Sequence, residues 1–283
     1  MANYYRIAHI TLRLEEPHFS FSGLHPFRTE PIEQPDIEVV GAQDLTADIS
    51  AISLIDRFDF RDANAVCELY QKGEGHHFQM VTERGECVVF DIPAEGIVRT
   101  NFQPDQQQAL FRFGLWVTFN IRAAHRSTLA IHSSVLVHNG GAVLCLGESG
   151  TGKSTHTRLW REHIPGTELL NDDSPIIRID EGVAYVYGSP WSGKTPCYRN
   201  EHYPIRAILR LSQGPRNEIR PLSILQSYGA LQPSFPPSFA HDKVLFGHTN
   251  RLLSELLKRV KVYHLSCLPN GEAAELARTT IYE

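Results

Sequence analysis

The stretch GESGTGKST, residues 147–155, constrains the fold of this chain more than any other feature of its sequence. It lies between the apolar run AVLCL and the helix-like HTRLWREHI, so a strand, a glycine-rich loop and a helix are expected in succession. The pattern G-x-x-x-x-G-K-[ST] is complete, with Gly147, Gly152, Lys153 and Ser154. It predicts a P-loop, whose backbone N–H groups surround the phosphates of a nucleotide.

Each residue type in this pattern has a chemical task. Glycines let the loop wrap tightly, and the following helix directs its partly positive N-terminal end at the phosphates. Lys153 is expected to reach the β- and γ-phosphates, and Ser154 to complete the ligand shell of Mg²⁺. ATP and Mg²⁺ are therefore the expected cofactors. The nucleotide-binding residues are expected to be Gly147, Glu148, Ser149, Gly150, Thr151, Gly152, Lys153, Ser154 and Thr155.

Length and composition indicate a soluble globular protein with one large or two ordinary domains. The chain has 283 residues, of which 42% are hydrophobic and 21% are charged. Its net charge of −5 argues against a nucleic-acid partner, because neutralising phosphates along a strand requires a basic face.

No segment indicates membrane insertion or secretion. Apolar runs are strand-sized, far below the roughly 18–20 residues of a membrane span, and charged residues interrupt the N-terminal segment. Five scattered cysteines without a C-x-x-C pair are typical of a reducing compartment, with neither a disulfide framework nor a zinc site. We expect a cytoplasmic protein with no membrane partner, and homo-oligomerisation stays open.

The character of the sequence changes along the chain and predicts two domains. A small β-rich domain is expected over 1–104, a connecting helix over 105–125, and an α/β P-loop domain with a mixed sheet over 126–283. Within the first domain, His76 and His77 follow KGEG and are expected in a solvated loop, because adjacent histidines on a strand would face opposite ways.

A pair of carboxylates follows the glycine loop closely. Asp172 lies nineteen residues past Lys153 (172 − 153), which leaves room for one helix, a Pro-Gly turn and a short strand. One carboxylate suits Mg²⁺ beside Ser154, and the other is free to take a proton from an attacking hydroxyl. Consecutive strand residues point apart, so Asp172 and Asp173 can both face the site only at a strand end.

Strand register brings a histidine to the same place. The dipeptide Asn139-Gly140 favours a two-residue hairpin turn. If Val137 pairs with Ala142, His132 lies across from Gly147 at the mouth of the loop. Farther along the chain, Lys194 in SPWSGK and Arg199 are candidates for neutralising charge on a transferring phosphoryl group, with a polar surface loop as the equal alternative.

The series AIHSSVL, GESGTGKST and LLNDD resembles the C-terminal kinase domain of HPr kinase/phosphorylase. The wider superfamily includes ATP-dependent phosphoenolpyruvate carboxykinase, and the resemblance covers residues from about 126 to 215. It implies that His132 assists near the γ-phosphate, that Asp172 is the general base, and that Asp173 joins Ser154 on the metal, with the two aspartate roles exchangeable. Thr155 stands where the family usually has Glu.

These observations predict an ATP-dependent kinase. The expected catalytic residues are Asp172, His132 and Lys153, with Ser154 and Asp173 on the metal. The γ-phosphate would pass to a hydroxyl of an unidentified acceptor, which is a small molecule or a protein serine. Two other classes stay open. A carboxykinase-like enzyme would need further basic residues around the metal, and a non-catalytic nucleotide-binding regulator would bind ATP without turnover.

Overall fold

The computed structural model describes residues 2–45, 49, 52–148, 150–193 and 196–283. Contacts within the chain divide it into two compact units. Unit 1 comprises Met1–His125 and Ser238–Phe246, and unit 2 comprises Arg126–Pro237 and Gly247–Glu283. The segment Ser238–Phe246 thus groups with the N-terminal part, although the expected P-loop domain, 126–283, included it.

Within the described residues, unit 1 contains one eight-stranded mixed sheet with the order β1-β2-β3-β8-β7-β6-β5-β4. Its strands are β1 (Asn3–Ile7), β2 (Ile10–Leu14), β3 (Ile37–Gly41), β4 (Ser53–Phe60), β5 (Ala65–Lys72), β6 (Gly75–Thr82), β7 (Cys87–Ile92) and β8 (Val98–Thr100). Strand β3 is parallel to both of its neighbours, and the other pairs are antiparallel. These strands all lie between Asn3 and Thr100.

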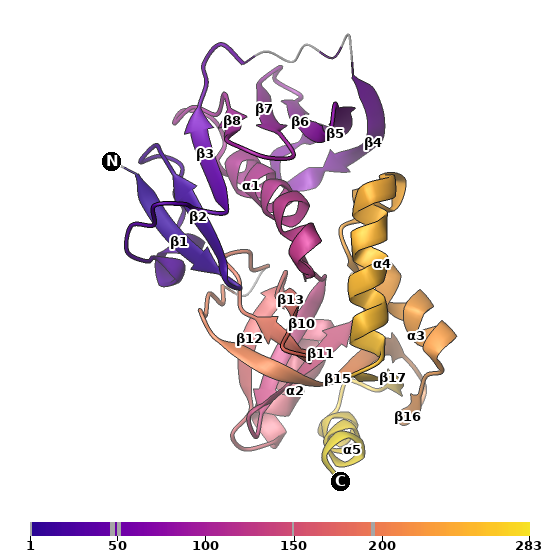
Figure 1. The fold of residues 1–283 in the computed structure, drawn as a ribbon. Coiled ribbons are helices and arrows are strands. Elements are labelled where there is room, and N and C mark those ends of the chain that lie inside the picture. Colours follow the sequence, from indigo (N-terminus) through magenta and orange to yellow (C-terminus); the bar gives the residue numbers. More distant parts are fainter. Residues whose placement is uncertain (1, 46–48, 50–51, 149, 194–195) are drawn as a thin grey trace. The chain divides into compact units, whose positions relative to one another are not determined.

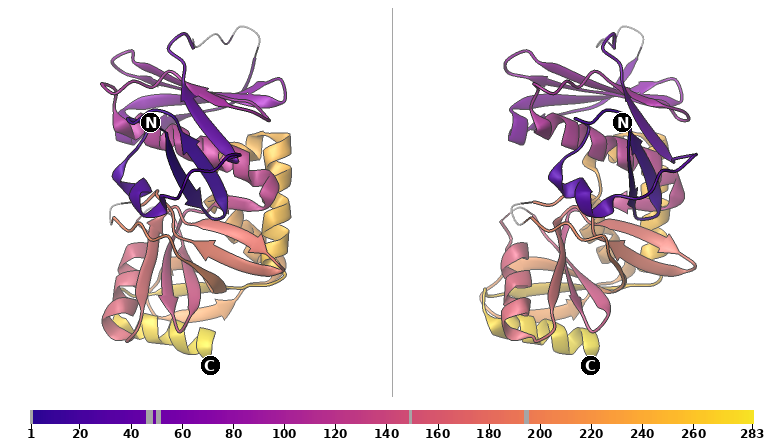
Figure 2. Two further views of the ribbon diagram at one scale, coloured as in Figure 1. Left: turned by 60° about the vertical axis from the view of Figure 1, so that its left-hand side comes forward. Right: turned by 90° about the vertical axis from the view of Figure 1, so that its left-hand side faces the viewer.

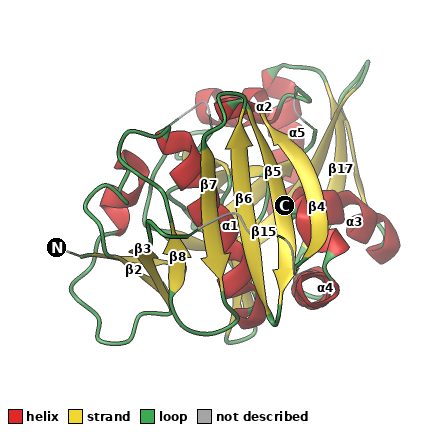
Figure 3. Cartoon of the chain, turned by 90° about the horizontal axis from the view of Figure 1, so that it is seen from above, coloured by secondary structure: helices red, strands yellow, loops and turns green. Residues whose placement is uncertain are grey.

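Helix α1 (Gln108–Ala123) is the helix expected over 105–125, and it packs against β7 within unit 1 (Figure 3). Its buried apolar side chains include Leu110, Phe111, Leu115 and Phe119. The contact is close at Gly114, where an added Cβ would lie 2.1 Å from the ring of Phe90. Three short 3₁₀ segments border these elements: η1 (Ser22–Phe27), η2 (Arg61–Ala63) and η3 (Ala124–Arg126).

The solvated loop expected at His76 and His77 is wrong. Both side chains are buried on β6, which is paired on both sides by β5 and β7. His76 faces Asp242, with Nε2 2.9 Å from Oδ2. His77 faces the opposite way, near Tyr70 and Asp91. Strand β6 begins at Gly75, within KGEG, and therefore includes both histidines.

Unit 2 contains, among the described residues, a nine-stranded mixed sheet. Its strands are β9 (Thr128–Ala130), β10 (Ser133–His138), β11 (Gly141–Leu146), β12 (Glu168–Asp173), β13 (Ile176–Asp180), β14 (Val183–Tyr187), β15 (His202–Gln213), β16 (Glu218–Pro221) and β17 (Lys261–Cys267). The main order is β12-β10-β11-β15-β14-β13-β9, with β17 beside β15 and β16 beside β17. Figure 1 shows β16 beside β17.

The remaining helices are α2 (Lys153–His163), α3 (Ile224–Leu231), α4 (Lys243–Leu257) and α5 (Gly271–Tyr282), with 3₁₀ segments η4 (Gln232–Ser234) and η5 (Pro237–His241). Helix α2 lies beside α5 (Figure 2). The two helices share one core with the sheet, in which Trp160 of α2 is fully buried near Ala274 and Ala277 of α5. The described residues contain no helix that is long and apolar enough to cross a membrane.

One edge of the unit 2 sheet collects several strand ends. Strands β11, β15 and β17 are parallel, so their carboxyl ends meet at this edge. Strand β10 is antiparallel to both β11 and β12, which brings its first residue and the last residue of β12 to the same edge. The glycine loop, the aspartate pair and His132 are therefore neighbours because of sheet topology.

Candidate functional site

The glycine loop connects the end of β11 to the first residue of α2. Gly150 and Gly152 have φ values of +83° and +101°, which side chains other than glycine adopt at a cost. At Gly147 an added Cβ would lie 2.3 Å from Oγ1 of Thr151, so this position requires glycine for a different reason. Ser149, one of the expected binding residues, lies outside the described residues.

The side chain of Lys153 turns back over the loop. Its Nζ donates to the carbonyl oxygen of Gly147 at 2.8 Å and to that of Glu148 at 3.3 Å. The same Nζ lies 3.1 Å from Nε2 of His132. Burial lowers the pKa of Lys153, and the carboxylates of Asp173 and Asp172 act in the opposite direction. The ammonium group thus lies among acceptors, next to the two aspartates.

His132 occupies the break between β9 and β10. The expected pairing of Val137 with Ala142 is confirmed. The pairing of β10 with β11 ends at Ser134 and Cys145, so His132 lies just beyond the paired residues. The backbone N–H of His132 donates to the carbonyl oxygen of Ser234 at 2.6 Å. Its ring is half-exposed, and Nδ1 lies 3.2 Å from Oδ1 of Asp173.

Asp172 is buried and faces the start of α2. Its Oδ1 accepts a short hydrogen bond from Oγ of Ser134, and Oγ of Ser154 lies 3.3 Å from both carboxylate oxygens. The backbone carbonyl of Asp172 accepts from the N–H of Gly193 at 2.6 Å. The hydroxyl groups of Ser134 and Ser154 therefore contact this carboxylate, and the hydrogen bond from Gly193 holds its backbone in place.

Asp173 follows directly but faces elsewhere. Its φ of +143° is rare for a residue with a side chain, and such strain persists only where the surrounding structure holds it. A bridge to Ser192 and the close approach of Gly193 provide that support. Because of this unusual φ, two consecutive carboxylates lie at the same edge of the sheet. Asp172 contacts Ser154, and the part-exposed Asp173 contacts His132.

The two basic candidates have different outcomes. Arg199 belongs to the segment after β14 and contacts Glu168 and Leu169, the first residues of β12. It is therefore at the opposite end of β12 from the aspartates. It forms ion pairs of 2.7 Å with both Glu168 and Glu201, so its charge is compensated there. Lys194 lies outside the described residues. Glu148 and Thr155 line hollows beside the loop.

The donor set at Asp172 fits Mg²⁺ bound together with a nucleotide. Its carboxylate and the nearby hydroxyl of Ser154 are oxygen ligands, which this hard cation prefers, and the hydrogen bond from Ser134 orients the carboxylate. The described residues contain no group of three or more His, Cys, Asp or Glu side chains able to hold a metal ion on their own. Mg²⁺ usually takes one or two carboxylates and completes its shell with phosphates and water, so such a cage is not required.

Two features of this edge escaped the sequence reasoning. Ser134 reaches Asp172 only because β10 pairs with β12, a register that no local pattern indicates. His156 and Trp160 lie one helical turn apart, and their contact is visible in the sequence only as i, i+4 spacing.

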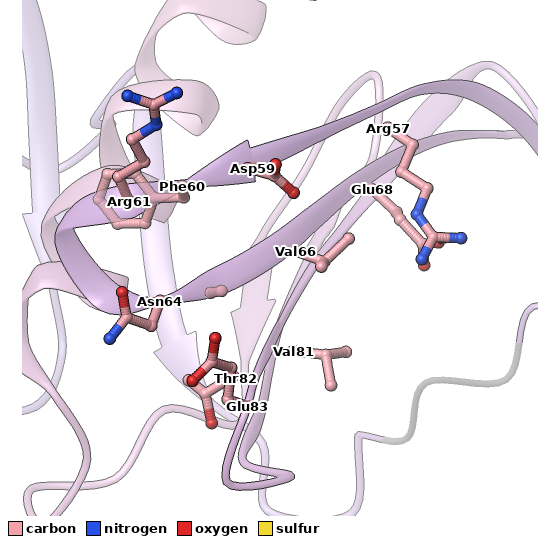
Figure 4. Close-up of a pocket in the computed structure, with 11 residues that line it drawn as sticks. Arg57, Asp59, Phe60, Arg61, Asn64, Val66, Glu68, Val81, Thr82 and Glu83 are labelled. Atoms are coloured by element: carbon pink, nitrogen blue, oxygen red, sulfur yellow. Dashed lines mark ion pairs between the residues drawn. The ribbon is translucent and has the colours of Figure 1, made fainter.

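Unit 1 has a hollow of its own, of about 550 Å³, at the β4–β5 turn (Figure 4). Its charged side chains have both signs, and Arg57 and Glu68 form an ion pair of 3.5 Å within it. Glu68 also accepts hydrogen bonds from Tyr70 and Gln79. The charges that line this hollow are therefore paired with one another in part.

Comparisons with known proteins find a distant likeness among solved structures. No protein-family model matches the chain, and no curated protein does. Among solved structures, the HPr(Ser) kinase/phosphatase from Coxiella burnetii is similar to this chain at 14% sequence identity with a TM-score of 0.31. The aligned region covers 53% of this chain and 91% of that protein.

Proposed function

We propose that this chain is an ATP-dependent kinase that transfers the γ-phosphate to a hydroxyl group of a small molecule or a protein serine. One observation carries the proposal: the glycine loop, its lysine and two differently placed carboxylates meet at one sheet edge. Holding phosphate and accepting a proton are separate tasks in phosphoryl transfer. The separate surroundings of Asp172 and Asp173 match those two tasks.

Asp172 and Ser154 are assigned to the metal, and this exchanges the aspartate roles given first by the resemblance. The contacts of Ser154 with both oxygens of Asp172 support the exchange, as does the hydrogen bond from Ser134. When bound, Mg²⁺ would supply positive charge against the phosphates. Lys153 would move from its loop carbonyls to the β- and γ-phosphates, which are the stronger acceptors.

Asp173 is assigned as the general base. Its carboxylate is part-exposed and therefore accessible to an acceptor, whereas that of Asp172 is buried. The acceptor hydroxyl would give its proton to Asp173 as its oxygen forms the new bond to phosphorus and ADP leaves. His132 lies between Asp173 and Lys153, so it would orient the base and contact the transferring group.

The test measures the transfer of labelled phosphate from γ-labelled ATP to acceptor molecules in a cell extract. We expect a labelled phosphomonoester with the natural chain and none with Lys153→Ala or Asp173→Asn. Treatment with hydroxylamine separates the acceptor classes, because it cleaves an acyl phosphate and leaves a phosphomonoester intact.

The alternative classes give different results in the same experiment. Label in a hydroxylamine-sensitive product would point to a carboxylate as the acceptor and would contradict transfer to a hydroxyl. A labelled enol phosphate that forms together with release of CO2 would instead support the carboxykinase-like alternative. ATP binding that is unaffected by Asp173→Asn, with no label transferred by any form of the protein, would contradict the kinase proposal and leave the non-catalytic regulator.

A further inference from the structure

Residues 188–193, which lie between β14 and β15, run beside β12 and are called the covering segment below. Ser192 forms a bridge with Asp173, and its Oγ lies 3.4 Å from the backbone carbonyl oxygen of Asp172. The N–H of Gly193 donates to the same carbonyl oxygen at 2.6 Å. The position of the covering segment therefore affects the backbone of both aspartates.

Asn171, the residue before the aspartate pair, joins the covering segment to β12. Its side chain is fully buried. Nδ2 lies 3.3 to 3.5 Å from four oxygen atoms, which are Oγ of Ser189 and the carbonyl oxygens of Ser189, Trp191 and Cys197. On the other side of the amide, Oδ1 accepts from the backbone N–H of Ser174 at 3.0 Å. One amide group thus contacts both the covering segment and the residue that follows the aspartates.

The chemistry of these partners explains why an amide stands at position 171. The backbone N–H of Ser174 can only donate, and the carbonyl oxygens of the covering segment can only accept. A primary amide offers one acceptor and two donors in a single plane, so its orientation here is fixed by its partners. A carboxylate would lack the donor, and an aliphatic side chain would lack both.

Ser189 completes the network around this amide. Its Oγ donates to the carbonyl oxygen of Ser174 at 2.6 Å and accepts from the N–H of Trp191 at 3.2 Å. Asn171, Ser189 and Ser192 are all fully buried, and none of them has an unpaired buried side-chain atom among the described residues. A buried polar network with all its members paired favours one backbone arrangement over others.

This network encloses the strained residue. Asn171 precedes Asp173 and Ser174 follows it, and the two are joined by the hydrogen bond from the N–H of Ser174 to Oδ1 of Asn171. The φ of +143° at Asp173 is sparsely populated and persists only where neighbouring contacts hold it. The network supplies contacts on both sides of that residue.

We propose that Asn171 is a positioning residue for phosphoryl transfer. Its amide holds the covering segment and Ser174 in place, and this keeps the carboxylate of Asp173 beside His132. The inference rests on the proposed function, because it takes Asp173 as the general base. The contacts of Lys153 with the loop carbonyls do not involve this amide, so its loss should affect transfer more than nucleotide binding.

The first experiment compares crystal structures of the natural chain and Asn171→Ala. We expect φ of Asp173 to leave the positive region in the variant, and the contact between Oδ1 of Asp173 and Nδ1 of His132 to be lost. Ser189→Ala removes the hydrogen bond to the carbonyl oxygen of Ser174 while the amide stays in place. It should shift Asp173 in the same direction, and it decides the matter if Asn171→Ala does not fold.

The second experiment separates positioning from a loss of stability. Asn171→Ala should lower transfer from γ-labelled ATP at saturating Mg-ATP by about 10–100-fold, the usual effect of losing a partner that orients a site residue. Its affinity for Mg-ATP should stay within a few-fold. Asn120→Ala is the matched control, because Asn120 is also fully buried and its Nδ2 donates to the carbonyl oxygen of Trp116 in α1 of unit 1. This control should transfer phosphate at the natural rate.

The outcomes distinguish this inference from the proposed function. An unchanged φ of Asp173 in the variant structures would overturn the role of Asn171 and leave the kinase proposal intact. An equal loss of transfer in Asn120→Ala, or a loss confined to Mg-ATP affinity, would also overturn it. If the natural chain transfers no label, the proposed function fails and transfer has no positioning residue, whereas the crystal structures still show whether Asn171 holds Asp173.

Discussion

Oδ1 of Asp173 lies 3.2 Å from Nδ1 of His132, whereas the preceding carboxylate, that of Asp172, contacts Ser154. Two neighbouring residues of one chemical type therefore have different partners. The strained backbone at Asp173 keeps both carboxylates at the edge of the sheet beside the glycine loop. In an ordinary strand the two side chains would point to opposite faces. The first prediction tests the division directly.

Asp173→Asn should keep Mg-ATP affinity within a few-fold and lower phosphoryl transfer by about 10²–10⁴-fold, the usual contribution of a positioned base. Asp172→Asn should instead weaken the Mg²⁺ dependence of nucleotide binding, because it removes a charged oxygen ligand. Titrations of ATP at several Mg²⁺ concentrations, together with transfer assays, measure both effects. The opposite pattern would restore the assignment of Asp172 as base and Asp173 as metal ligand.

Lys153→Ala should abolish the thermal stabilisation caused by Mg-ATP. A ligand present at a hundred times its Kd stabilises the native state by about 2.7 kcal/mol, so the loss is measurable in a melting experiment. Lys258→Ala is a suitable control, since Lys258 is exposed and pairs only locally with Glu255. An unchanged shift in the Lys153 variant would remove the phosphate-binding role of the loop.

Ser134→Ala should weaken Mg-ATP binding by about tenfold, because outer partners that orient a metal ligand typically contribute that much. Its hydroxyl donates to the carboxylate of Asp172. The adjacent Ser133 is equally buried, but its hydroxyl has no partner among the described residues, so Ser133→Ala should leave binding unchanged. Equal effects of the two substitutions would show that Ser134 does not act through Asp172.

His156 should make the stability of the fold depend on pH. Burial lowers its pKa to about 4, below the value of about 6.5 in an unfolded chain. The neutral ring therefore contributes its full stability above pH 6.5, and this contribution is lost as the pH falls toward 4. Between pH 6.5 and pH 5 the free energy of unfolding should fall by about 2 kcal/mol through this group.

Urea unfolding at those two pH values measures the change in the free energy of unfolding. In His156→Phe the part of this change that comes from His156 should be absent. His163→Phe provides the control, because His163 is exposed on the same helix. If the natural chain and His156→Phe show the same slope, the ring of His156 is not held neutral by burial.

Local pattern alone was sufficient for the parts of this protein in which neighbours in sequence are neighbours in space. The helix over 153–163, the strand at ELLNDD and the hairpin at Asn139-Gly140 were all predictable, because turn chemistry and side-chain spacing act within a few residues. The same reasoning failed at His76 and His77, because their burial depends on the pairing of β6 with β5 and β7 and, for His76, on Asp242, far away in the chain.

The sequence by itself determined the loop, its lysine and the nearby return of two aspartates, since these depend on short spacings. Only the tertiary structure decided which aspartate contacts Ser154, that Ser134 reaches Asp172, and that Arg199 is compensated at the far end of β12. The physical reason is that pairing between β10 and β12, and the φ of Asp173, are set by packing across the whole sheet. The partner of a strand that lies far away in the chain depends on packing across the sheet, so it cannot be read from the local pattern of a single sequence.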